Sequence, residues 1–233
     1  ARMEGTAREI HLVARPRGFP GEDLFELAET AIPDPGEGQL LVRNAYFSVD
    51  PYMRPRMNDV RSYVAPFTLG EALTGGAVGR VAASRHASYA EGDWVVHGLG
   101  WREWALSDGS GVRKIDPTRA PVSLALGVLG MPGFTAYYGL FELGRPQEGE
   151  TVFVSGAAGA VGSAAGQMAK IAGCRVLGCA GSEEKIAWLR ELGFDEAFDY
   201  RKQTVHEALR AAAPDGIDIY FDNVGGETLE AAI

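Results

Sequence analysis

The stretch VFVSGAAGAVGSAAGQMAKIAG, residues 152–173, decides the fold of this chain. Its first residues have the apolar pattern of a buried strand, and residues 160–173 have the pattern of a helix. Glycine permits a tight turn and lets backbone amides approach a pyrophosphate, whose charge is favoured at a helix N-terminus. The stretch therefore predicts a dinucleotide-binding loop, and the alternative is a purely structural turn. The expected loop residues are Gly156, Ala157, Ala158, Gly159, Ala160, Val161 and Gly162.

The alternation of strand and helix continues to the end of the chain. Strand patterns occur at residues 151–156, 174–181, 196–200 and 218–226, and helical patterns at residues 160–173, 182–192 and 204–213. Strands that alternate with helices are typical of a parallel sheet covered on both faces. We therefore expect an α/β domain with a Rossmann-type doubly wound parallel sheet.

The first half of the chain has a different pattern of apolar residues. Up to about Asp116, short alternating runs are separated by Gly, Pro and Asp turns, at residues 39–49, 76–84, 93–98 and 101–107. This pattern is typical of an antiparallel barrel or sandwich. The sequence thus predicts two domains, residues 1–120 and residues 121–233.

An uncharged segment, residues 120–141, is about as long as a membrane-spanning helix. Glycines and Pro132 interrupt it. Because Pro ends helices and Gly weakens them, we expect a buried pair of short helices between the domains rather than a membrane span.

Composition excludes several classes of protein. Lys and Arg number 22 against 31 for Asp and Glu, a net charge of -9, so a nucleic-acid partner is not expected. The N-terminal stretch ARMEGTAREI lacks the apolar core of a signal peptide, which favours a cytoplasmic protein. Cys174 and Cys179 lie on one expected strand, about 16 Å apart, too far for a disulfide.

The end of the second strand of the dinucleotide domain indicates which cofactor is bound. NAD sites usually place an acidic residue there for the ribose hydroxyls, and this chain reads CAGSEEK, with no acid at the strand end. Ser182 and Lys185 can meet a 2'-phosphate instead, which favours NADP. The alternative is a solvated Lys185 balanced by Glu183 and Glu184.

Five motifs in collinear order resemble one family: VDPYMR (49–54), GMPGFTAYYGL (130–140), GAAGAVGS (156–163), GSEEK (181–185) and DNVGG (222–226). The chain is similar to the zinc-independent branch of the medium-chain dehydrogenase/reductases, which includes prostaglandin reductases and alkenal double-bond reductases. The resemblance implies a GroES-like β-barrel catalytic domain followed by a Rossmann domain. It also implies a homodimer in which NADPH reduces the double bond of an α,β-unsaturated ketone or aldehyde.

The resemblance also implies roles for individual residues. The nicotinamide end of the cofactor is expected near Met131, Pro132 and Thr135, and the adenosine phosphate near Ser182, Lys185 and Tyr200. Asn223 is expected to face the bound cofactor, because the first and fourth strands of such a sheet flank the dinucleotide crevice. For Tyr200, an ordinary tyrosine at a strand end is an equal alternative.

Tyr52 is the candidate catalytic residue. It follows Asp50 and Pro51 on an expected turn. From there its hydroxyl can donate a hydrogen bond to the substrate oxygen that gains negative charge during hydride addition. Aromatic residues near turns are often structural, which is the alternative for Tyr52.

A metal site is not expected. The chain has two cysteines and four histidines without the spacing of zinc ligands, and it reads LGEALTGG where zinc enzymes of the superfamily carry Gly-His-Glu. His97 is interpreted as a core or surface histidine.

Only four of the six strands that such a domain needs can be counted before Ile233. We therefore expect a C-terminally incomplete domain, from either a shortened protein or an incomplete sequence. A family tyrosine from the later region has no counterpart to assign. Two functions remain as alternatives to the enone reductase: an NADPH quinone oxidoreductase and a non-catalytic dinucleotide-binding protein.

Overall fold

The computed structural model describes residues 5–233 and divides the chain into two compact units, residues 1–126 and 127–233. The predicted limit between domains lies a few residues earlier, after residue 120. The N-terminal unit contains β1 (Thr6–Leu12), η1 (Glu22–Leu24), β2 (Phe25–Ala31), β3 (Leu40–Phe47), α1 (Met53–Arg56), β4 (Ala77–Ser84), β5 (Trp94–His97), β6 (Trp104–Ser107), β7 (Arg113–Ile115) and η2 (Val122–Leu126). The C-terminal unit contains α2 (Met131–Tyr137), η3 (Tyr138–Gly144), β8 (Thr151–Val154), α3 (Ala160–Ile171), β9 (Arg175–Ala180), α4 (Glu183–Glu191), β10 (Glu196–Asp199), α5 (Val205–Ala212), β11 (Ile219–Phe221) and α6 (Gly226–Ala232).

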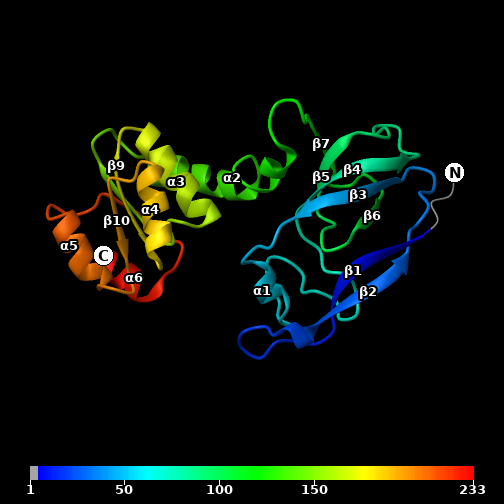
Figure 1. Ribbon diagram of the computed structural model, residues 1–233, viewed down its shortest axis with the longest axis horizontal. Helices are drawn as coiled ribbons and strands as arrows, with labels where there is room; N and C mark the ends of the chain where they lie inside the picture. Colours follow the sequence, from blue (N-terminus) through cyan, green and yellow to red (C-terminus); the bar gives the residue numbers. More distant parts are fainter. Residues whose placement is uncertain (1–4) are drawn as a thin grey trace. The chain divides into compact units, whose positions relative to one another are not determined.

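The N-terminal unit is built from antiparallel strands, as predicted (Figure 1). One sheet has five strands in the order β6-β3-β4-β5-β7, and β1 and β2 form a separate two-stranded ribbon. Alternate apolar residues of the sheet form a core, in which Val42 lies opposite both Val81 and Ala105. This core fixes which face of each strand is buried.

Two parts of the N-terminal unit differ from the expectation. The run at residues 101–107 was expected to be one strand, whereas β6 begins only at Trp104. Residues 100–103 instead form a loop whose Trp101 has a φ of 60°, a conformation incompatible with a strand. The β1–β2 ribbon was not predicted, because its strands are partly exposed and have no clear apolar alternation.

The C-terminal unit contains the predicted parallel doubly wound sheet. Its four strands have the order β10-β9-β8-β11, so the first strand of the unit lies between the second and the fourth. Successive residues of β8 point to opposite faces, and each face has its own core. Val152 and Val154 belong to one core, and Phe153 belongs to the other, where it stacks on Phe198. Helices cover both faces, which explains why these strands are continuous apolar runs.

The uncharged segment of residues 120–141 is broken into short helices, as predicted. It contains η2, α2 and the start of η3, which is π-helical. The expectation that these helices are buried is wrong, because many apolar side chains of the segment are exposed, among them Leu129 at 60% and Phe134 at 66%. Gly133 sits so close to the carbonyl group of Val128 that a side chain there would overlap the backbone. Within residues 5–233, no helix is long and apolar enough to cross a membrane.

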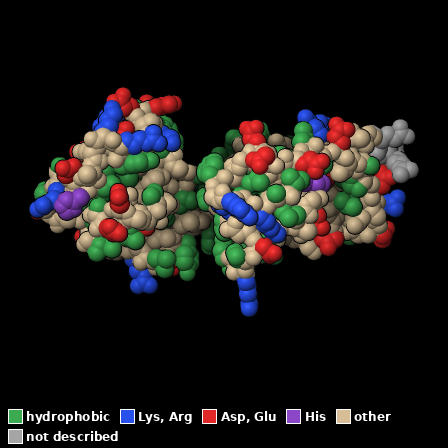
Figure 2. Space-filling view, turned by 90° about the horizontal axis from the view of Figure 1, so that it is seen from below, with side chains coloured by type: hydrophobic (Ala, Val, Ile, Leu, Met, Phe, Trp, Pro, Cys, Tyr) green, Lys and Arg blue, Asp and Glu red, His purple; other side chains and the backbone are tan. Residues whose placement is uncertain are grey.

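Charged side chains of both signs are interspersed over each unit on the face shown in Figure 2. Several form exposed ion pairs, such as Arg8 with Glu103 at 2.6 Å and Lys170 with Asp195 at 2.8 Å. Exposed pairs of this kind contribute only about 0–1 kcal/mol each to stability. The folding free energy therefore comes mainly from the two sets of apolar cores.

Candidate functional site

The glycine-rich loop joins β8 to α3 in a shape that only glycines allow. Gly156 has a φ of 54°, in the left-handed region. A Cβ on Gly162 would lie 2.5 Å from the carbonyl oxygen of Gly156, so the helix can approach the loop only without a side chain there. Gly159 caps α3, and within residues 5–233 no side chain forms a cap hydrogen bond at this end. The first amides of α3 are therefore available to an anion.

A cavity of about 380 Å³ lies beside this loop. It brings together residues that are far apart in the sequence: the glycine loop, the end of β9, the first turn of α4, Tyr200 after β10 and the segment after β11. The lining residues are Gly156, Ala158, Gly159, Cys179, Ala180, Gly181, Lys185, Tyr200, Val224 and Thr228. The cavity is thus lined by Lys185 and Tyr200, two of the three residues expected at the adenosine phosphate.

The third of these residues, Ser182, caps α4. Its hydroxyl oxygen accepts a hydrogen bond from the backbone N–H of Lys185 at 3.3 Å, and its own O–H remains a donor. Tyr200 reaches over Gly181, where a Cβ would lie 2.7 Å from the tyrosine hydroxyl oxygen. Glu183, in the same turn, is paired with Lys202, which lowers the pKa of the Glu183 carboxyl and raises that of Lys202. Glu183, one of the two acids that could balance Lys185, is therefore paired with another lysine.

Asn223 is held beside the glycine loop by the serine that ends β8. The side-chain amide of Asn223 donates to the backbone oxygen of Ser155 at 2.9 Å, and the backbone N–H of Asn223 donates to the Ser155 hydroxyl at 2.9 Å. A Cβ on Gly156 would lie 3.4 Å from the Cβ of Asn223. Among the described residues, Asn223 does not line the cavity, although its neighbour Val224 does. The contact of Asn223 with a cofactor stays a prediction.

Asp222 organises the same loop and was missed in the sequence analysis. One of its carboxylate oxygens accepts hydrogen bonds from the Tyr220 hydroxyl at 2.7 Å, from the Ser155 hydroxyl at 3.1 Å and from two backbone amides at 2.8–2.9 Å. Burial raises the pKa of Asp222, but the hydrogen bonds outweigh it and lower the pKa to about 2. The only sequence signal was an Asp followed closely by glycines, the pattern of a turn in which the side chain accepts from the backbone.

The residues expected at the nicotinamide end lie on α2, which packs against α3. Pro132 is buried at the start of the helix, whereas Met131 and Thr135 are exposed. None of the three lines the 380 Å³ cavity within the described part of the chain. Their role at the cofactor stays a prediction.

Tyr52 lies just before α1 in the N-terminal unit and is half-buried. The turn is fixed by the hydroxyl of Ser48, which donates to the Asp50 carboxylate at 2.8 Å. The ring of Tyr52 packs against a core that includes Met53 and Leu73. Burial, and after it the charge of Asp50, raise the pKa of the Tyr52 phenol. Tyr52 is therefore a neutral hydrogen-bond donor at physiological pH.

His97 has a structural role, as interpreted. Its Nδ1 accepts from the backbone N–H of Leu99 at 3.1 Å, so its Nε2 carries the proton and donates to the Asn44 side-chain oxygen at 2.9 Å. Burial, and less so the charge of Arg102, lower the pKa of His97 to about 4. Among residues 5–233, no group of three or more His, Cys, Asp or Glu side chains is arranged to hold a metal ion.

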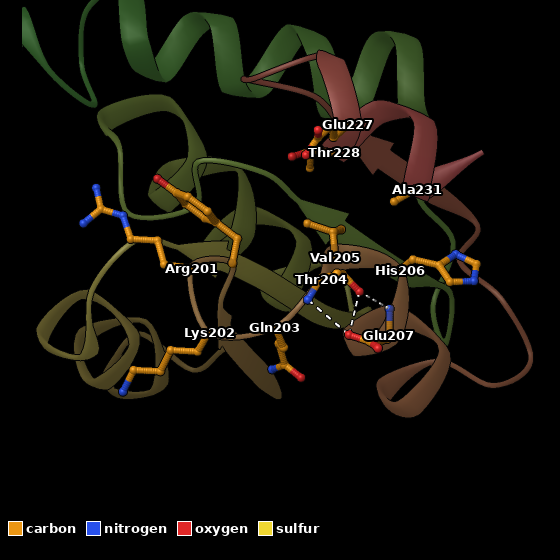
Figure 3. A pocket seen from close by; sticks show the side chains of 11 residues that line it. Arg201, Lys202, Gln203, Thr204, Val205, His206, Glu207, Glu227, Thr228 and Ala231 are labelled. Carbon is orange, nitrogen blue, oxygen red and sulfur yellow. Dashed lines mark hydrogen bonds between the residues drawn. The ribbon is translucent and has the colours of Figure 1, made fainter.

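A second cavity of about 540 Å³ lies beyond Tyr200, between the start of α5 and α6 (Figure 3). Two of its polar residues, Thr204 and Glu207, already serve the local structure. The Thr204 hydroxyl donates to the Glu207 carboxylate at 2.7 Å and accepts from the Glu207 backbone N–H at 3.2 Å, which caps α5. The smaller cavity at the glycine loop is therefore the better candidate site.

Comparison with known proteins identifies the family. Residues 8–115 match the model described as "N-terminal domain of oxidoreductase", and residues 160–233 match "Zinc-binding dehydrogenase". The protein YfmJ of Bacillus subtilis is 50% identical, over 99% of this chain and 68% of YfmJ. The NADPH-dependent curcumin reductase of Escherichia coli is 47% identical, over 95% of this chain and 65% of the reductase.

A solved structure shows the same fold. The crystal structure of CurA from Vibrio vulnificus in complex with NADPH matches with a TM-score of 0.92 and 46% identity, over 97% of this chain and 67% of CurA. This chain spans 65–68% of the length of the two relatives above. With both domain models, these relatives and the shared fold, the chain belongs to the zinc-independent branch of the medium-chain dehydrogenase/reductases.

Proposed function

We propose that the protein is an oxidoreductase that uses NADPH to reduce the carbon-carbon double bond of α,β-unsaturated ketones and aldehydes. The observation that carries this proposal is the cavity at the glycine loop, which joins a pyrophosphate-binding turn to Lys185 and Tyr200. Curcumin, the substrate named for one relative, contains such a double bond next to a carbonyl group. The matching structure of CurA contains NADPH.

The residues of the C-terminal unit fit this cofactor. Gly156 and Gly162 let the loop fold closely against α3, which leaves the first backbone amides of the helix to bind a pyrophosphate. Ser182, Lys185 and Tyr200 hold the 2'-phosphate, and Asn223 contacts the cofactor from the segment after β11. Met131, Pro132 and Thr135 are assigned to the nicotinamide end. NADPH supplies a hydride for the double bond.

Tyr52 is assigned to the substrate. Its hydroxyl donates a hydrogen bond to the carbonyl oxygen, where negative charge gathers when hydride adds to the β-carbon. Its raised pKa keeps the phenol protonated for this purpose. The reaction needs positioning and one such donor, and it needs no metal ion.

The proposal extends to the oligomeric state of the protein and to its location in the cell. We assign the chain to a homodimer, in line with the family resemblance, with domains at residues 1–120 and 121–233. We also assign the protein to the cytoplasm, a reducing compartment in which buried free thiols such as Cys174 and Cys179 stay reduced.

The test is NADPH consumption by the purified full-length protein with a panel of enones, enals and quinones, with product analysis. We expect saturated ketones and aldehydes as products. A preference for quinones would replace the proposed function with a quinone oxidoreductase. Tight NADPH binding without oxidation by any acceptor would indicate a non-catalytic dinucleotide-binding protein.

A further inference from the structure

Trp101 combines two unfavourable features in one residue. Its φ of 60° lies in the left-handed region, which is strained for a bulky side chain. Its indole N–H is the one buried side-chain polar group among residues 5–233 that lacks a hydrogen-bond partner. A buried donor without a partner costs about 1–3 kcal/mol. Arg145, the other non-glycine residue with positive φ in the described chain, simply ends a helix, where this conformation is common.

The strained backbone of Trp101 is fixed from both sides. Before it, the N–H of Gly100 donates to the Gly75 oxygen at 2.9 Å, and after it, the Trp101 oxygen accepts from the N–H of Ile10 at 2.9 Å. The side-chain amide of Asn44 donates to two further carbonyl oxygens of this segment at 3.0 and 2.9 Å. Strain held this firmly by its surroundings is typical of functional sites.

Both Trp101 and Tyr52 point their polar atoms at Gly75. A Cβ on Gly75 would lie 3.6 Å from the indole nitrogen of Trp101 and 3.7 Å from the hydroxyl oxygen of Tyr52. The same Cβ would overlap the terminal methyl group of Met53. The two aromatic rings also pack on the same apolar core. Because position 75 has no side chain, the flexible side chain of Met53 fills this point, and its terminal methyl group must move for the indole N–H and the phenol oxygen to meet.

We propose that the indole N–H of Trp101 donates a hydrogen bond to the Tyr52 hydroxyl oxygen when Tyr52 donates its own hydrogen to the substrate carbonyl oxygen. Trp101 is then a positioning residue for Tyr52, and this inference rests on the proposed function. A phenol hydroxyl accepts and donates at the same time, and the bond it accepts fixes the direction of its O–H. Catalytic hydrogen bonds that are long in the free enzyme commonly shorten in the substrate complex.

The test is a double-mutant cycle with Trp101→Phe and Tyr52→Phe in the full-length protein. Phenylalanine keeps an aromatic ring against Phe47, 5.1 Å away between ring centroids, while it removes the N–H donor together with part of the ring volume. We expect Trp101→Phe to lower kcat about fivefold, the effect of one neutral hydrogen bond, with an unchanged KM for NADPH. In the Tyr52→Phe background the same substitution should have no further effect on kcat.

The pH profile distinguishes positioning from packing. A donated hydrogen bond stabilises the phenolate, so its removal raises the pKa of Tyr52 and should move the alkaline limb of kcat to higher pH. The other groups that act on the Tyr52 phenol are Asp50, Arg56 and Tyr63, and Trp101→Phe leaves all three in place.

Trp104→Phe is the matched control, because Trp104 lies in the same unit and stacks with Arg43 at 5.7 Å. It should leave kcat unchanged. If Trp101→Phe does not fold, the indole N–H resonance of Trp101 replaces kinetics: it should shift when NADPH and an unreactive enone analogue bind to the wild type, and should not shift in Tyr52→Phe.

Three outcomes overturn the inference. The first is a wild-type kcat for Trp101→Phe, and the second is additive losses of kcat in the double mutant. The third is a Trp101 indole N–H resonance that does not shift when NADPH and the enone analogue bind. A wild type that oxidises no NADPH with any acceptor would overturn the proposed function together with this inference. Normal wild-type turnover with an unaffected Trp101→Phe variant would overturn the inference alone.

Discussion

Replacing Lys185 by alanine tests the assignment of the cofactor. Lys185 lines the 380 Å³ cavity, and its side chain is exposed at the first turn of α4. A hydrogen bond to a charged group contributes about 1.5–3 kcal/mol, and exposure to solvent and salt places Lys185 at the lower end. About 1.5 kcal/mol corresponds to a roughly tenfold weaker binding of NADPH. NADH lacks the 2'-phosphate, so its affinity should change by less than about twofold.

Weaker NADPH binding by the Lys185→Ala variant should not result from unfolding of helix α4. A cation is unfavourable at a helix N-terminus, and alanine is the best helix former, so α4 should not weaken in the Lys185→Ala variant. The measurement is a titration of both cofactors at low and high salt, with Lys170→Ala as a control, because Lys170 pairs with Asp195 at the other end of α3. Salt should weaken NADPH binding more in the wild type than in the variant. Equal losses for both cofactors, or no loss at all, would refute the phosphate contact.

Four further results are expected. Tyr52→Phe should lower kcat about tenfold or more while the Kd of NADPH stays constant, and an unchanged kcat would make Tyr52 structural. Burial lowers the pKa of His97 from the ordinary 6.5 to about 4. Between these pH values the unfolded chain binds a proton that the folded chain does not. The free energy of unfolding should therefore fall by up to about 3 kcal/mol as the pH is lowered from 6.5 to 4. Denaturant titrations of His97→Gln should lack this decline; a parallel decline would contradict the assignment. Gly162→Ala should lower both Tm and NADPH affinity, since its Cβ would lie 2.5 Å from the Gly156 oxygen, and wild-type values would show that the loop relaxes. Chelators should leave turnover unchanged, and stoichiometric zinc in the pure protein would disprove metal independence.

The sequence predicted features that depend on neighbouring residues. The apolar runs of the parallel sheet are continuous because both faces are covered, so the strands and helices of residues 151–213 were found near their observed bounds. The last strand was expected at residues 218–226, whereas β11 ends at Phe221, because the Asp222 carboxylate accepts from the next backbone amides and turns the chain. Lys185 and Tyr200 were expected together, and they line one cavity.

Features that depend on long-range contacts were missed. The Ser155 hydroxyl gains its partners, Asp222 and Asn223, only because β11 pairs with β8, and no local pattern shows that pairing. The positive φ of Trp101 depends on hydrogen bonds from Gly100 to Gly75 and from Ile10 to Trp101, so the residue was assigned to a strand. Neither the β1–β2 ribbon nor the π-helical turn η3 has a strong local signature.

The order of the strands also determines the stage of translation at which the cofactor site can form. The glycine loop leaves the ribosome early, but the amide of Asn223 that completes it is separated from Ser155 by 68 residues. Until β11 has been translated, β8 has a free edge and the oxygen atoms of Ser155 lack these donors. A nascent chain that ends before β11 therefore presents the glycine loop without its opposite wall. The affinity for the dinucleotide should appear abruptly during translation, when β11 docks, rather than grow with each added strand.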